Sequence, residues 1–403
     1  MTTNFHFSKN IDMAFKQDPP GQWLTPVPPG CLRLSSGYPE PALVPSEEIK
    51  LAVARLLDEE KDLPLHYIGS PRIPQLTEFL RDRMAQRAVE ATADEVLVTS
   101  GACQAIDLIA RILLDDQAFV AVESPTYMEA LEIFQNYTEH YITIPIDEEG
   151  MQTAVLAEML AQRKAQGLAI PRLLYTIPTY QNPTGTTLSP ARRQQVLELA
   201  EQYDFLILED DAYGELGFSD RPKLLKAMDV NNRVLYVGSL SKVVAPGMRI
   251  GWVIADSQLI QPLSWFKKDL THPFDQATMA SFLEVTDFDR HLRTLTAVYE
   301  SKCQAMLMAL EKFLPPTVSW FVPQGGYFVW VKIPGVDTSK MLPKAFDAGV
   351  SYVPGKYFFL NQQEGLEYLR LSFSYASEDD IVKGIQLLSE VVGVAIDTPN
   401  QTQ

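Results

Sequence analysis

The stretch from about Val96 to Val253 constrains the fold most, because short apolar runs alternate there with helical patterns. A continuous apolar run, such as Phe205 to Leu208, is typical of a strand that is buried on both faces. Strands that are separated by helices predict a mostly parallel sheet with crossover connections. We therefore expect an α/β fold, with functional residues at the edge where the carboxyl ends of the strands meet.

Lys242 follows one of these apolar runs. In YVGSLSKVVAPGMRIGW (Tyr236 to Trp252), Ser239 and Ser241 precede this lysine and Arg249 comes seven residues after it. A lysine amine can form a Schiff base with a carbonyl, and two hydroxyls with a guanidinium suit a phosphate dianion. The combination indicates pyridoxal 5'-phosphate (PLP). The alternative is a solvated lysine at a strand end, which is common in proteins.

Three acids come directly after another apolar run. Glu209, Asp210 and Asp211 follow Leu208, and Tyr213 lies two residues further on. A half-buried carboxylate among them requires a cationic partner. A protonated pyridine nitrogen is such a partner, and it makes the PLP ring an electron sink. In the alternative interpretation, the acids cap the start of a helix in solvent.

Further candidates lie in turns after strands. Asn182 begins the turn Asn-Pro-Thr-Gly, and its amide can bond a phenolate oxygen on one side and a carboxylate on the other. The turn Ser100 to Cys103 precedes a helix, where backbone amides bind phosphate well. Tyr127 follows the strand that ends at Glu123, which places an aromatic ring where it can stack on a flat ligand.

In these motifs the chain resembles the class I/II aminotransferases of PLP fold type I. It is most similar to the subgroup that holds 2-aminoadipate and kynurenine aminotransferases and the aminotransferase-like domains of MocR regulators. Asn-Pro-Thr-Gly, Asp-Asp-Ala-Tyr and Ser-x-Ser-Lys with Pro-Gly-x-Arg occur in the family's order, and the resemblance extends from Pro29 to Tyr375. It implies a large α/β domain with a mostly parallel sheet and a smaller α+β domain.

The resemblance implies a role for each matching residue. Lys242 would hold PLP and move the proton, Asp210 would pair with the pyridinium nitrogen, and Tyr213 with Asn182 would bond the phenolic oxygen. Arg370 would clamp the substrate α-carboxylate, assisted by Asn182 and the backbone at Gly37. The remaining residues implied to bind the cofactor are Tyr127 by stacking, Gly101, Ala102, Cys103, Ser239, Ser241 and Arg249 around the phosphate, and Tyr67 from the other subunit of a homodimer.

The chain departs from the family at two places. Relatives commonly have Ser-Gln where Ala102-Cys103 stands, so a hydroxyl contact with the phosphate is missing. Near Tyr67 the usual Gly and Arg are Arg72 and Thr77, which puts substrate specificity in doubt more than cofactor binding. An aromatic lining of the substrate pocket would favour aromatic or large aliphatic amino acids, and the residues expected in it are Tyr38, Ile68, Ile73, Phe274 and Tyr327.

We expect three segments. Residues 1–45 form an N-terminal arm and part of the small domain, 46–284 form the large PLP-binding domain, and 285–403 form the C-terminal small domain. Five prolines surround Trp23 between Pro19 and Gly30, which predicts an extended arm or linker; a partner-binding polyproline motif is the alternative.

Composition excludes several classes of protein. With 34 Lys and Arg against 51 Asp and Glu, the net charge is −17, which is ill suited to nucleic acid or an anionic membrane. Three cysteines and five histidines without ligand spacing predict neither a disulfide framework nor a metal site. The first residues lack the apolar core of a signal peptide, and no apolar run reaches the length of a membrane span. A cytoplasmic enzyme is expected.

The predicted function is transfer of an amino group from an α-amino acid to a 2-oxo acid, with 2-oxoglutarate as the expected acceptor, in amino acid metabolism or biosynthesis. A PLP-dependent lyase or decarboxylase on the same scaffold is an alternative, because the cofactor machinery is shared. A MocR-like ligand-sensing domain without its DNA-binding part is another. The acidic charge and the short segment before Pro29 argue against this regulator.

Overall fold

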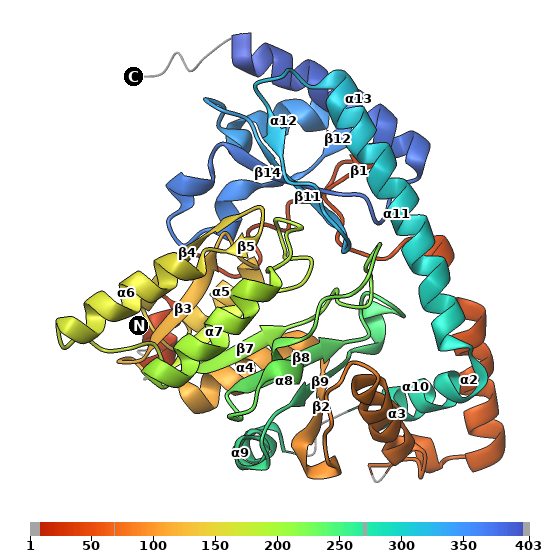
Figure 1. The fold of residues 1–403 in the computed structure, drawn as a ribbon. Coiled ribbons are helices and arrows are strands. Elements are labelled where there is room, and N and C mark those ends of the chain that lie inside the picture. The colour runs from red at the N-terminus through yellow and green to blue at the C-terminus, as the bar shows by residue number, and fades with distance from the viewer. Residues whose placement is uncertain (1–8, 68, 269–271, 398–403) are drawn as a thin grey trace, which may run out of the picture.

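The computed structural model describes residues 9–67, 69–268 and 272–397. Its larger part contains a broad sheet with helices on both faces, and its smaller part contains a second sheet (Figure 1). The 26-residue helix α11 (Phe288–Phe313) runs along one side of both parts. The chain therefore has the α/β architecture that the sequence predicts.

The larger sheet has eight strands in the order β2-β9-β8-β7-β6-β3-β4-β5. The five central strands from β8 to β4 are parallel, whereas β9 is antiparallel to both of its neighbours and β5 is antiparallel to β4. This confirms the prediction of a mostly parallel sheet. The bounds are β2 Val96–Ser100, β3 Phe119–Ser124, β4 His140–Asp147, β5 Gly150–Met151, β6 Leu173–Thr176, β7 Leu206–Asp210, β8 Val234–Ser239 and β9 Ile250–Ile254.

Two hydrophobic cores lie on opposite faces of this sheet. On one face, α4 (Gly101–Leu113), α5 (Met128–Gln135) and α9 (Ser257–Lys267) bury apolar side chains such as Ile109 and Phe134 against the strands. On the other face lie α6, α7 and α8, whose bounds are Thr153–Ala165, Pro190–Tyr203 and Leu225–Met228. Coverage on both faces explains why β3, β6, β7 and β8 are buried along most of their length.

Three further helices pack together near the β2 edge of the sheet, namely α2 (Ser46–Glu60), α3 (Ile73–Ala85) and α10 (Pro273–Val285). The predicted limits of the large domain, 46 and 284, lie at the start of α2 and at the end of α10. The division into domains itself stays a prediction.

The smaller sheet has the order β10-β11-β14-β13 and is antiparallel. Its strands are β10 Ser319–Trp320, β11 Phe328–Lys332, β13 Val353–Pro354 and β14 Tyr368–Ser372. Helices α11, α12 (Thr338–Ala348) and α13 (Glu378–Asp397) share one core with the apolar residues of β11 and β14. Short 3-10 turns complete the connections: Pro41–Leu43, Leu63–Leu65, Ala93–Glu95, Pro246–Met248, Gly355–Phe358 and Gln362–Gly365.

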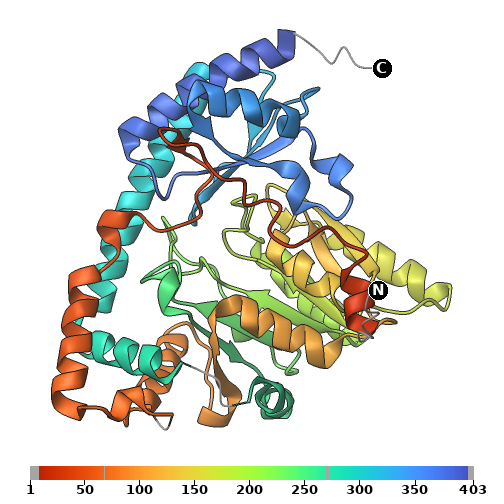
Figure 2. The same ribbon diagram turned by 180° about the vertical axis from the view of Figure 1, so that it is seen from behind.

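The N-terminal arm crosses from the larger part to the smaller part (Figure 2). It contains the short helix α1 (Lys9–Ala14), which the sequence did not predict, followed by an extended segment. The Gly21 N–H donates to Glu132 Oε1 over 2.8 Å, which ties the arm to α5. At its far end, β1 (Leu32–Arg33) pairs in parallel with β12 (Val350–Ser351) in the smaller part.

None of the helices in residues 9–67, 69–268 and 272–397 is long and apolar enough to cross a membrane. Over the same residues, no His, Cys, Asp and Glu side chains gather in a group of three or more that could hold a metal ion.

Candidate active site

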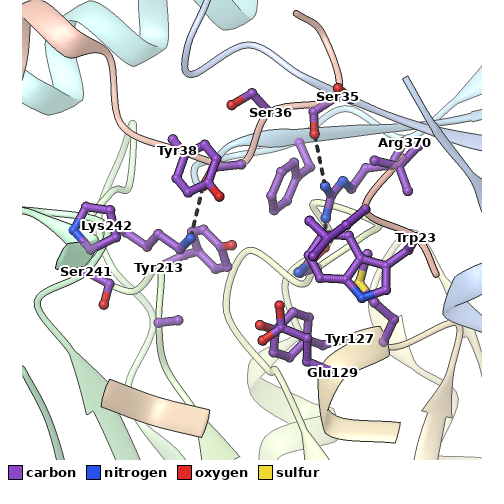
Figure 3. A pocket seen from close by; sticks show the side chains of 18 of the residues that line it. Trp23, Ser35, Ser36, Tyr38, Tyr127, Glu129, Tyr213, Ser241, Lys242 and Arg370 are labelled. Atoms are coloured by element: carbon purple, nitrogen blue, oxygen red, sulfur yellow. Dashed lines mark hydrogen bonds between the residues drawn. The ribbon is translucent and has the colours of Figure 1, made fainter. Parts of the chain in front are cut away.

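A cavity of about 410 Å³ lies at the carboxyl ends of β7 and β8, between the larger part, the smaller part and the arm (Figure 3). Most residues that the sequence singled out meet there. The predicted residues that line it are Gly37, Ala102, Cys103, Tyr127, Asn182, Asp210, Tyr213, Ser239, Ser241, Lys242, Arg249 and Arg370. Sites at this edge are expected for an open α/β sheet.

Lys242 lies three residues beyond the end of β8, in the wall of the cavity. Its Nζ donates to the Gly37 carbonyl oxygen over 2.9 Å and lies 5.9 Å from the centre of the Tyr213 ring. Burial and, after it, the positive charge of Arg370 lower the pKa of this amine to about 8. The amine therefore changes protonation near neutral pH, as a nucleophile or a proton carrier must.

Asp210 lines the cavity and has one carboxylate oxygen without a hydrogen-bond partner among the described residues. Its Oδ2 accepts a hydrogen bond of 2.8 Å from the Tyr175 hydroxyl, whereas the buried Oδ1 has none among the described residues. Burial raises the pKa of Asp210 to about 6. A buried oxygen without a partner is costly, so a cationic N–H group of a ligand would stabilise it.

The two acids beside Asp210 have partners in the protein, although the buried Oδ1 of Asp211 also accepts no hydrogen bond from the described residues. Glu209 is fully buried and accepts hydrogen bonds of 2.8 Å from two backbone N–H groups at the start of α8. Asp211 pairs with the Arg87 guanidinium over 2.5 Å and accepts a 3.0 Å hydrogen bond from the Tyr236 hydroxyl. Glu209 and Asp211 do not line the cavity, so Asp210 is the acid of this run that a ligand can reach.

Arg370 and Asn182 orient each other inside the cavity. Arg370 Nη1 donates to Asn182 Oδ1 over 2.9 Å, which leaves the amide N–H groups of Asn182 to donate elsewhere. Arg370 Nη2 donates to the Ser35 carbonyl over 3.3 Å, and the guanidinium stacks 4.0 Å from the centre of the Phe328 ring. Burial lowers the Arg370 pKa to about 10, so it remains cationic at neutral pH. A fixed planar cation is suited to a carboxylate.

Hydroxyl, guanidinium and backbone N–H groups converge at the other end of the cavity. Ser239 Oγ donates to Ser241 Oγ over 3.0 Å, and Arg249 Nη2 donates to the Ser100 carbonyl over 3.2 Å. Gly101 starts α4 with a φ of +77°, and a Cβ there would come within 2.5 Å of Arg249 Nη2. Glycine is therefore required for this close approach, although Gly101 lies behind the wall. The arrangement fits a phosphate at a helix N-terminus.

Tyr127, Cys103 and Glu129 form the wall on the side of α5. The Cys103 thiol donates to Glu129 Oε2 over 3.1 Å, and its sulfur lies 3.8 Å from the Tyr127 hydroxyl. Burial raises the pKa of Cys103 to about 12, so this cysteine is a neutral thiol and not a reactive thiolate. Sequence reasoning missed Glu129, although an acid two residues after the candidate stacking tyrosine was a signal.

Some predictions about the substrate pocket need correction. Tyr38 lines the cavity, but Ile73 and Phe274 do not, and Tyr327 lies behind Lys242, where its hydroxyl donates to the Lys242 carbonyl over 2.7 Å. Ile68 lies outside the described residues. Apolar wall residues that the sequence did not single out are Trp23, Leu24, Val27, Met128, Phe346, Tyr352 and Val353.

The arm residues of this wall were missed because hydrophobic periodicity does not show where an extended, proline-rich segment folds back onto the rest of the chain.

The predicted cofactor residue Tyr67 is fully exposed and does not line the cavity of its own chain.

The groups in the cavity fit PLP. Lys242 would supply the amine for the aldehyde carbon, Asp210 would pair with the pyridine nitrogen, and the groups around Arg249 would hold the phosphate. Bound PLP withdraws electrons from the α-carbon of an amino acid.

Comparison with known proteins agrees with this fit. The family model "Aminotransferase class I and II" matches residues 29–387. The aromatic-amino-acid aminotransferase 1 of Thermococcus litoralis is 38% identical over 367 residues, which cover 90% of this chain and 88% of that protein.

Solved structures show the same similarity. A kynurenine aminotransferase of Pyrococcus horikoshii, in complex with PMP, is 36% identical, covers 97% of this chain and 95% of its own, and has a TM-score of 0.86. An α-aminoadipate aminotransferase of Thermus thermophilus, complexed with N-(5'-phosphopyridoxyl)-L-leucine, is 31% identical, covers 97% and 98%, and has a TM-score of 0.87. This chain belongs to the class I and II aminotransferases and is a PLP-dependent enzyme of fold type I.

Proposed function

We propose that this aminotransferase takes the amino group from a large aromatic or apolar α-amino acid and passes it to a 2-oxo acid, with 2-oxoglutarate as the expected acceptor. The observation that carries this proposal is the apolar and aromatic wall that closes the cavity beside Arg370. The names of the similar proteins, which include aromatic-amino-acid and kynurenine aminotransferases, support the same class of donor.

Each side chain has a separate task in this reaction. Arg370 binds the α-carboxylate of either substrate, and its bond to Asn182 keeps the guanidinium in place. Lys242 holds the cofactor and moves the proton at the α-carbon, for which its lowered pKa is suited. Asp210 would keep the pyridine nitrogen of bound PLP protonated. Tyr213 and Asn182, which also line the cavity, would hold its phenolic oxygen.

The mouth of the cavity supports a dicarboxylate acceptor. Arg33 lines the cavity from β1 and stacks 5.9 Å from the Tyr375 ring. Within the described part of the chain it has no ion-pair partner, so its charge is available to the distal carboxylate of 2-oxoglutarate. We also propose a cytoplasmic location, with which the acidic composition agrees.

We also propose a homodimer. Apolar side chains near Tyr67 are exposed in the single chain, among them Leu51, Leu63 and Leu65, which belong to α2 and to the turn that follows it. A two-fold contact at this surface would cover them and bring Tyr67 to the phosphate of the neighbouring active site.

A panel of amino donors with 2-oxoglutarate and pyruvate tests the substrate proposal. Aromatic donors should react with the largest kcat/KM, and each turnover should yield one 2-oxo acid and one new amino acid. Release of carbon dioxide or ammonia without a new amino acid would instead assign the decarboxylase or lyase alternative.

A further inference from the structure

Two charged side chains of the cavity have no task in binding PLP or the α-carboxylate of a donor. The charged residues in its wall are Arg33, Glu129, Asp210, Lys242, Arg249 and Arg370. The last four hold the cofactor and the carboxylate in the proposed function. Arg33 is exposed at the mouth, whereas Glu129 lies within the cavity. Glu129 is therefore the charged residue inside the cavity to which the proposed function gives no role.

Glu129 is the second residue of α5, directly after Met128. Figure 3 shows its carboxylate on the Tyr127 side of the pocket, directed into the space between Lys242 and Arg370. The Cys103 thiol donates to Glu129 Oε2 over 3.1 Å. The Tyr127 hydroxyl is a second partner of this carboxylate. A carboxylate accepts about four hydrogen bonds, so these two neighbours leave part of its capacity unused.

The nearest cations to act on Glu129 are Lys242 and Arg370, whose pKa values its charge raises. Within the described residues Glu129 forms no ion pair, and the adjoining wall is built from apolar and aromatic side chains, namely Trp23, Leu24, Val27, Met128, Phe346 and Val353. Beyond the contacts with Cys103 and Tyr127, a further hydrogen bond to this carboxylate can come from a donor on the ligand.

The arm that supplies Trp23 is fixed to the same helix. Glu132, one turn after Glu129, accepts the backbone N–H of Gly21 over 2.8 Å. The apolar wall and the carboxylate are therefore held at a defined separation by α5. A side chain that fills this space needs an apolar body and a polar end that donates a hydrogen bond.

We propose that Glu129 determines side-chain specificity by accepting a hydrogen bond from an O–H or N–H group on an aromatic substrate side chain. The inference rests on the proposed function and adds to it a preference among aromatic donors. A site that accepts a hydrogen bond from a substrate discriminates against the analogue that lacks the donor. Hydrogen bonds to charged groups correspond to about 10- to 100-fold in binding.

Tyrosine and phenylalanine are the matched probes, because they differ by one hydroxyl. We expect the wild-type enzyme to prefer tyrosine by about 10-fold or more in kcat/KM, and Glu129→Leu to reduce the tyrosine to phenylalanine ratio by about 10- to 100-fold. Both substrates are measured on one preparation, so the ratio does not depend on the folded fraction. Glu129→Gln, which keeps the shape and an acceptor oxygen, should give an intermediate ratio.

Glu198→Gln is the matched control, because Glu198 lies on the surface of α7 and bonds to Gln194; it should leave the ratio unchanged. Equal activity of wild type toward both amino acids, or a ratio that Glu129→Leu does not alter, would overturn the assignment. The absorbance of the bound cofactor separates this failure from failure of the proposed function. If aromatic donors change the absorbance without discrimination, only the role of Glu129 is wrong; if none changes it, the donor class is wrong as well.

Discussion

At the residue scale, chemistry in this enzyme depends on burial that changes the protonation of side chains. Lys242 is the clearest case, because burial and the charge of Arg370 lower its pKa to about 8. The negative charge of Glu129 and the Cys103 side chain raise the pKa of Lys242, whereas the positive charge of Arg249 lowers it. The lowered pKa means that the amine is neutral above about pH 8, whereas a solvated lysine is neutral only above about 10.4.

Capture of PLP by the cofactor-free protein tests this pKa. Only the neutral amine attacks the aldehyde, so the rate should rise with pH, reach half of its limit near pH 8 and then level off. Stopped-flow absorbance measures this rate. A profile that continues to rise to about pH 10 would show that Lys242 is solvated and that its surroundings have been misjudged.

Asp210 supplies a second residue-scale prediction. Asp210→Asn removes the charge that keeps the pyridine nitrogen protonated, while Lys242 and the phosphate contacts remain. Turnover should fall by roughly a hundred-fold or more, with PLP still bound. Steady-state kinetics and cofactor absorbance measure the two effects separately. Asp116→Asn, at an exposed position, is the control, and near-normal turnover of the Asp210 variant would exclude the role.

At the element scale, α7 holds the loop that carries Asn182. Arg193 of this helix is buried and donates to the carbonyl oxygens of Leu188 over 2.9 Å and Pro178 over 2.5 Å, at the two ends of that loop. It also lies 3.9 Å from Glu209. The guanidinium thus connects the start of α7 with the end of β7, on the side of the sheet away from the cavity.

Arg193→Met should destabilise the enzyme strongly, because it leaves the buried Glu209 without its cation. We expect a loss of about 3–5 kcal/mol in the free energy of unfolding, measured by urea denaturation of the holoenzyme. Arg192→Met is the control from the neighbouring position: its partner Asp147 is more exposed, and the loss should be about 1 kcal/mol or less. Equal losses for the two variants would contradict the role of the buried pair.

The sequence predicted best those features that a short stretch of neighbouring residues determines. Continuous apolar runs such as Phe205 to Leu208 predicted the central strands. The polar residues after these strands predicted most of the cavity, because a parallel sheet brings strand ends to one edge. Trp23 and Phe346 could not be found in this way, since they reach the cavity through contacts between distant segments.

At the scale of the whole molecule, the single chain leaves Tyr67 and the apolar residues near it exposed, and the homodimer follows as a prediction. Light scattering at micromolar concentration should give about twice the 45.2 kDa chain mass. Tyr67→Phe should weaken PLP binding without dissociating the dimer, which titration of the cofactor-free protein measures. A fully active monomer would contradict this arrangement.

The two parts of the molecule and the arm meet at Lys242. The assignment of the cavity as the active site depends on Lys242 being the residue that carries PLP. Borohydride reduction of the purified holoenzyme, followed by proteolysis and mass spectrometry, tests this directly. We predict that the reduced cofactor is found on the peptide that contains Lys242, and that Lys242→Ala abolishes the label. A label on another lysine, or bound PLP that borohydride does not attach to the chain, would contradict the assignment of this cavity as the active site.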